Sequence, residues 1–150
     1  RVLALLNVGT LGVIRAPEVR SADDIDHDAA VTAIATAPEV IKGVKVRMVS
    51  PGVTALGIDL PKAAKAIASE AGVPVMVHVG DIMEQNPVAA ELAPILLTDV
   101  LGEGDIVTHT LSHQVGALLA DGSLLPQARE ARAKGVYFDV GVGGSNFAFD

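Results

Sequence analysis

Five apolar segments recur along the chain at near-constant intervals, and each carries one polar residue close to its carboxyl end. These residues are Asn7, Lys45, His78, His109 and Asp139, separated by steps of 38, 33, 31 and 30 residues. A β/α barrel of about 250 residues contains eight βα units of about 31 residues and places its chemistry at the carboxyl ends of its strands. A lysine, two histidines and an aspartate in register at such ends suggest a metal site assembled from different strands.

The rest of the chain predicts a strict alternation of strands and helices. Glycines such as Gly72 and Gly135 end helical patterns shortly before the next apolar segment begins. This alternation with short turns indicates a parallel sheet with right-handed crossovers. The expected strands cover residues 2–7, 44–49, 73–79, 105–110 and 136–140, and the expected helices cover residues 23–37, 59–71, 87–101 and 124–134.

Five strands fall short of the eight that close a barrel, and an open doubly wound sheet would also accommodate five. The positions of charged residues in the strands distinguish a partial barrel from an open doubly wound sheet. Lys45 and Arg47 share one face of their strand, opposite Val44 and Val46. Cations on one face of a central parallel strand are unfavourable unless that face lines a polar cavity, which a barrel mouth provides. We therefore expect an α/β fold, a partial TIM-type (β/α) barrel, with residues 1–150 forming one domain that is incomplete at both ends.

The composition fits a helix-covered parallel sheet and argues against membranes and nucleic acid as partners. Half of the residues are apolar and 3% are aromatic, as expected for parallel strands covered by helices rich in alanine and leucine. No apolar run reaches the ~18 residues of a membrane span. The net charge is −7 and the sequence contains no cluster of Lys or Arg, which argues against nucleic acid as a partner. The absence of cysteine excludes disulfides and thiolate ligands and is consistent with a cytoplasmic protein.

Lys45, His78 and His109 are the candidate metal ligands. Neutral imidazole is the commonest nitrogen ligand of Zn²⁺ and related metals. Burial lowers the pKa of a lysine and makes its amine available as a nucleophile, and such an amine can add CO₂ to form a carbamate, an anionic ligand. The alternatives are histidines that only fill the core, a lysine that reaches solvent, and a lysine that forms a Schiff base.

Four segments carry a resemblance to a known family. They are residues 44–49 (VKVRMV), 74–81 (PVMVHVGD), 104–110 (GDIVTHT) and 135–149 (GVYFDVGVGGSNFAF), and the opening LALLNVGTLGVI agrees with them. In order and spacing they resemble the amidohydrolase superfamily, and most of all its dihydroorotase-like branch of deacetylases. The resemblance covers nearly the whole chain.

The resemblance implies a binuclear metal site, with zinc as the expected metal. The lysine matching Lys45 is carboxylated in that family and bridges two metals, and the histidines matching His78 and His109 bind the second metal. The family's catalytic aspartate ends the last barrel strand, so its role is not transferred to Asp139. Two features depart from the family: the His-x-His pair of the first strand has no counterpart, and Val142 stands where a Gly-His-Gly turn usually has its histidine.

We therefore expect an internal piece of a longer metal-dependent amidohydrolase. The parent would hydrolyse an amide, a cyclic amide or an acyl ester in a small molecule through a metal-activated water, and this chain alone would be nearly inactive. One alternative is a Schiff-base lyase that uses Lys45. Another is a non-catalytic partial barrel that acts as a subunit or binding module. In each case the open edges of the sheet predict self-association or pairing with missing barrel strands.

Overall fold

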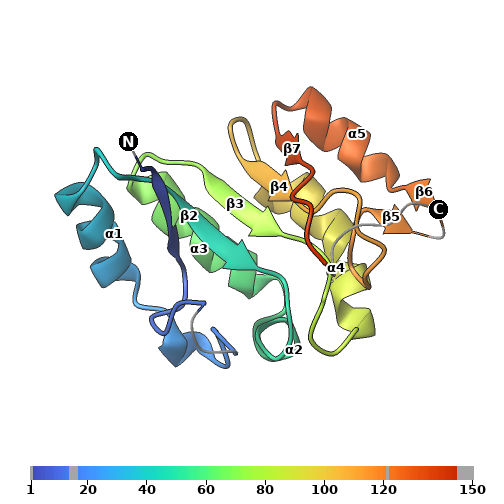
Figure 1. The fold of residues 1–150 in the computed structure, drawn as a ribbon, viewed down its shortest axis with the longest axis horizontal. Helices are drawn as coiled ribbons and strands as arrows, with labels where there is room; N and C mark the ends of the chain where they lie inside the picture. Colours follow the sequence, from blue (N-terminus) through green and yellow to red (C-terminus); the bar gives the residue numbers. More distant parts are fainter. Residues whose placement is uncertain (1, 14–16, 121, 145–150) are drawn as a thin grey trace.

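The computed structural model describes residues 2–13, 17–120 and 122–144. Its main element is a five-stranded parallel sheet whose spatial order, β1-β2-β3-β4-β7, is also the order along the chain (Figure 1). The strands are β1 (Ala4–Asn7), β2 (Ile41–Arg47), β3 (Val75–His78), β4 (Ile106–Thr108) and β7 (Tyr137–Asp139). Parallel neighbours in chain order are what successive right-handed βα units produce, so the predicted alternation is confirmed.

Helices fill the connections between these strands. They are η1 (Ala22–Asp24), α1 (His27–Thr36), α2 (Gly52–Leu56), α3 (Asp59–Glu70), α4 (Pro87–Ile95), the π-helical η2 (Leu96–Val100) and α5 (Pro126–Ala133). A two-stranded hairpin, β5 (Leu119–Ala120) with β6 (Ser123–Leu124), precedes α5. Side-chain oxygens cap two of the helices: Asp26 accepts from Ala29 at the start of α1, and Asn86 accepts from Val88 at the start of α4. No helix in the described ranges is long and apolar enough to cross a membrane.

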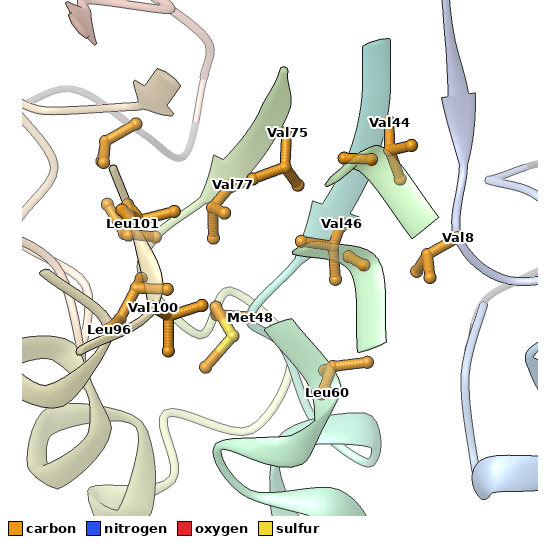
Figure 2. Packing of buried hydrophobic residues seen from close by; sticks show 14 of the residues in the cluster. Val8, Val44, Val46, Met48, Leu60, Val75, Val77, Leu96, Val100 and Leu101 are labelled. Atoms are coloured by element: carbon orange, nitrogen blue, oxygen red, sulfur yellow. The ribbon is translucent and has the colours of Figure 1, made fainter. Parts of the chain in front are cut away.

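One face of the sheet carries the hydrophobic core. Val44 and Val46 of β2 and Val75 and Val77 of β3 are buried to 1% exposure or less. Figure 2 shows these valines beside apolar side chains of the covering helices, among them Leu60 of α3. Because this face is apolar, helices pack on it and exclude water, and each buried valine or leucine contributes roughly 1.5–3 kcal/mol to folding.

The opposite face carries the polar side chains. Registered partners in a parallel sheet point the same way, and alternate residues of a strand share a face. One row across the sheet pairs Arg47 with His78, His78 with Thr108, and Thr108 with Asp139. Two residues earlier, Lys45 pairs with Met76 on the same face. The sheet therefore places Lys45, His78 and Asp139 on its second face, toward the carboxyl ends of its strands.

The predicted boundaries were wrong in several places. The helix expected from residue 23 begins only at His27, because Asp24 binds the backbone and guanidinium of Arg20 instead of capping that helix. The helix expected over 87–101 is α-helical only as far as Ile95, and residues 96–100 form a π-helix. Pro94, just before this change, lacks the N–H that a regular helix uses. The helix α2 and the hairpin β5–β6 lie where loops were expected. The final expected turn falls partly on residues 145–150, outside the described residues.

Candidate metal centre at the strand ends

His78 is the last residue of β3 and is buried, with 3% exposure. Its Nε2 lies 3.1 Å from the backbone oxygen of Gly80. A carbonyl oxygen can only accept a hydrogen bond, so Nε2 carries the proton and donates it. The other ring nitrogen, Nδ1, therefore keeps its lone pair, as a metal ligand requires.

His109 follows β4 directly and is not part of the strand, contrary to the prediction. Its backbone has a φ of 70°, a conformation that few non-glycine residues adopt. Its Nδ1 donates to the oxygen of Gly141 at 2.6 Å, which leaves the lone pair on Nε2. The left-handed turn brings the ring against that of His78, with centroids 4.4 Å apart and ring planes at 67°.

The pKa of His78 is lowered to about 3, first by burial and then by the neighbouring His109 and Lys45. Protonating a buried imidazole beside another cationic group is unfavourable on both counts. His78 is consequently neutral throughout the physiological pH range. A neutral ring with a free lone pair is the form that binds a divalent metal.

Lys45 lies on the same face, and its Nζ is buried with no hydrogen-bond partner among the described residues. Burial lowers the pKa of Lys45 to about 8; the Glu18 carboxylate opposes this change, Arg47 adds to it, and Asp139 opposes it. A buried ammonium ion without a partner is costly, so the environment increases the fraction of neutral amine relative to an exposed lysine. The Lys45 amine is therefore a buried polar group on the face of the sheet that also carries His78, and it interacts electrostatically with that imidazole.

Glu18 lies against the polar face of the sheet, and nothing in the sequence predicts this position. Its side chain is 2% exposed, and its Oε2 accepts from Arg47 Nε at 2.9 Å and from Asn7 Nδ2 at 3.2 Å. Its Oε1 has no partner in the described part of the chain. Arg47 is therefore held in a partly buried ion pair with Glu18. Glu18 lies in the loop after β1, 29 residues before Arg47, and no motif in the sequence marks it.

Asp139 and the two other histidines of the chain, His27 and His113, lie outside the contact between His78 and His109. Asp139 ends β7, is exposed, and accepts from Thr108 Oγ1 at 2.6 Å. His113 is exposed, and His27 pairs with Glu70 at 2.9 Å between α1 and α3. Within residues 2–13, 17–120 and 122–144, no three His, Cys, Asp or Glu side chains gather as a metal-ligand group. Two histidines alone do not complete a metal site.

The chain was compared with known proteins by sequence and by structure. No protein-family model matches the chain. Over 99% of its length it is 34% identical to a deacetylase of Brucella anthropi and to a deacetylase of Agrobacterium fabrum, and 29% identical to a deacetylase of Enterococcus faecalis. The chain spans 36%, 36% and 39% of the lengths of these three curated relatives.

Two solved structures extend the comparison to the fold. A dihydroorotase matches 99% of this chain with a TM-score of 0.79 and 35% identity, and the match covers 45% of that protein. An adenine deaminase matches 97% of this chain with a TM-score of 0.81 and 27% identity, and the match covers 38% of it. The five-stranded sheet is thus part of a TIM-type (β/α) barrel, as predicted. The resemblance to the amidohydrolase superfamily, in its dihydroorotase-like and deacetylase branch, is confirmed.

Proposed function

We propose that this chain is the part of a metal-dependent amidohydrolase barrel that carries half of its metal site, formed by Lys45, His78 and His109. The observation that supports the proposal most strongly is the contact between two imidazoles that each keep a free lone pair. The buried Lys45 Nζ, which has no partner among the described residues, lies on the same face. The relatives named deacetylase favour a small-molecule amide, cyclic amide or acyl ester as substrate.

The chemistry of Lys45 follows from its surroundings. Its neutral amine attacks the carbon of CO₂, a nitrogen–carbon bond forms as one C=O π electron pair moves onto oxygen, and one proton leaves the nitrogen to water, so that the neutral amine becomes an anionic carbamate. That anion would be a third ligand beside His78 Nδ1 and His109 Nε2. Zn²⁺ or a related divalent metal held there would lower the pKa of a bound water and polarise the scissile carbonyl.

The proposed site is incomplete within this chain. The first-strand His-x-His pair and the final aspartate of the family have no counterpart here, and we assign no catalytic residue. We propose that residues 1–150 form one partial-barrel unit and, from the cysteine-free composition, that the protein is cytoplasmic. The chain alone should therefore show little or no hydrolysis, and metal binding is the property to measure.

Calorimetric titration with Zn²⁺ tests this proposal. Two imidazoles and one carbamate leave Zn²⁺ short of a full binuclear ligand set, so we expect weak binding that weakens further in H78A and in H109A. H27A is the matched control, because His27 lies on the surface against Glu70 and should not affect binding. Tight binding that survives both H78A and H109A would show that the ligands lie elsewhere.

A Schiff-base enzyme is the second candidate, because the pKa of Lys45 near 8 also suits an amine nucleophile. Borohydride reduction in the presence of a carbonyl compound separates the two. A Schiff-base lysine would gain a stable adduct at Lys45. The metal-site proposal instead expects no adduct, and expects the signal of a carbamate carbon when ¹³C-labelled bicarbonate and Zn²⁺ are added together.

A further inference from the structure

One peptide unit at the strand ends is held from both sides. The carbonyl of Gly80 accepts from His78 Nε2 at 3.1 Å, and the N–H of Asp81, in the same planar unit, donates to the oxygen of Val115 at 2.7 Å. A rotation of this unit would break both bonds together. The loop after β4, which contains Val115, therefore helps to orient the carbonyl that holds the His78 ring.

The side chain of Asp81 ties this unit to a third loop. It is completely buried, and it accepts from Ser50 N at 3.1 Å and from Ser50 Oγ at 2.8 Å in the loop after β2. The backbone N–H groups of Met83, Glu84 and Asn86 donate to the same carboxylate at 3.1, 3.3 and 3.0 Å. Asp81 thus joins the loops after β2, β3 and β4. Lys45 lies in β2, His78 ends β3, and His109 follows β4 directly.

The backbone of Gly80 has a conformation and a close packing that a residue with a side chain could not easily adopt. Its φ is 96°, a conformation that side chains rarely permit, and an added Cβ would lie 3.0 Å from Gln114 Cβ and 3.3 Å from Ser112 Oγ.

Burial acts to raise the pKa of Asp81, but the hydrogen bonds from Asn86 and Ser50 outweigh it and the pKa is lowered. The carboxylate is therefore charged, and its partners in the described residues are neutral donors.

We propose that Asp81 is a positioning residue, which keeps the Gly80 carbonyl on His78 Nε2 and so leaves His78 Nδ1 free and aimed into the site. The part of this inference that concerns metal rests on the proposed function. The part that concerns the His78 ring does not. Partners that orient a ligating histidine in this way typically change metal affinity by about 10–100-fold when they are removed.

The test compares D81N with D105N. Asp105 is the matched control, a buried carboxylate at the opposite ends of the strands, where it accepts from Val75 N, Gly102 N and Lys65 Nζ. In nitrogen-15 spectra of the metal-free chain, at concentrations where light scattering detects no aggregate, we expect the His78 Nε2 proton to exchange about tenfold faster in D81N, as for one lost hydrogen bond. D105N should lower thermal stability and leave that proton unchanged.

Zinc titration supplies the second readout. D81N should bind Zn²⁺ about 10–100-fold more weakly than the unchanged chain, and D105N should not. S50A, which removes one hydrogen bond and keeps the carboxylate, should shift both readouts in the same direction by less, and it carries the test if D81N does not fold. Equal effects of D81N and D105N, or no effect of D81N and S50A on the His78 proton, would overturn the inference. If the unchanged chain binds no Zn²⁺, the proposed function fails while the proton exchange still decides the role of Asp81.

Discussion

At the scale of single residues, two lysines of the chain illustrate opposite electrostatic situations. Lys65 Nζ lies 2.5 Å from the buried carboxylate of Asp105, in an ion pair that joins α3 to the start of β4. Lys45 Nζ is buried with no partner among the described residues, and burial lowers its pKa to about 8. A buried charge that lacks a partner opposes folding, whereas a paired one supports the structure around it.

We expect K45M to be more stable than the unchanged chain at pH 7. In the unfolded chain Lys45 regains its usual pKa near 10.5, so the unfolded state binds more protons than the folded state between pH 8 and pH 10.5. The contribution of Lys45 to the free energy of unfolding therefore rises with pH in that window. K45M should gain on the order of 2 kcal/mol at pH 7, and this gain should shrink toward pH 10.5. Denaturant unfolding at both pH values, in buffers free of metal and CO₂, measures it.

The paired variant K65M should behave in the opposite way. Removing Lys65 leaves the Asp105 carboxylate, among the described residues, with two backbone donors, so K65M should lower the free energy of unfolding at pH 7. If K45M were also destabilising, or if its advantage did not change with pH, the Lys45 amine would have a partner that the described residues do not show.

At the scale of elements, the sequence predicted what depends on pattern and missed what depends on tertiary contacts. Apolar runs at regular spacing placed all five strands of the main sheet, because burial on one face and register at the carboxyl ends leave a repeated signature. His109 was wrongly placed inside a strand, since its left-handed backbone depends on the bond to Gly141, 32 residues away. Glu18 was missed because only the folded chain brings it to Arg47.

Gly43 gives a prediction for the strand that carries Lys45. A Cβ at this position of β2 would lie 2.8 Å from Leu5 Cδ2 and 2.8 Å from the backbone oxygen of Pro74, so both neighbouring segments would have to move. We expect G43A to reduce the free energy of unfolding by about 1–3 kcal/mol. Gly102 is the control, because an added Cβ meets no atom within 4 Å, and G102A should stay within about 1 kcal/mol of the unchanged chain. Equal losses in thermal or denaturant unfolding would refute the crowding argument.

At the scale of the whole molecule, helices cover one face of a sheet whose other face is polar and partly open. In the described residues, β1 and β7 each pair on one side only. Beside β7, a groove of about 430 Å³ is lined by Thr110, Leu124, Ala128, Arg129, Arg132 and Phe138. In a closed barrel the strands leave no such edges, so the shape of this sheet is what a segment of the barrel would have.

The edges predict how the isolated chain behaves in solution. Neither Ala4–Asn7 nor Tyr137–Asp139 contains the lysine or proline with which natural edge strands discourage pairing, and Leu5 and Tyr137 are exposed to 36% and 59%. We expect the chain to self-associate or aggregate, with light scattering that grows with concentration and rapid amide exchange in both strands. Monodisperse monomers with slowly exchanging amides throughout β1 and β7 would contradict this, because the amides on the unpaired side of an edge strand have no backbone partner to protect them. Such a result would favour a self-contained open α/β domain, and it would remove the need for partner strands that the partial barrel implies.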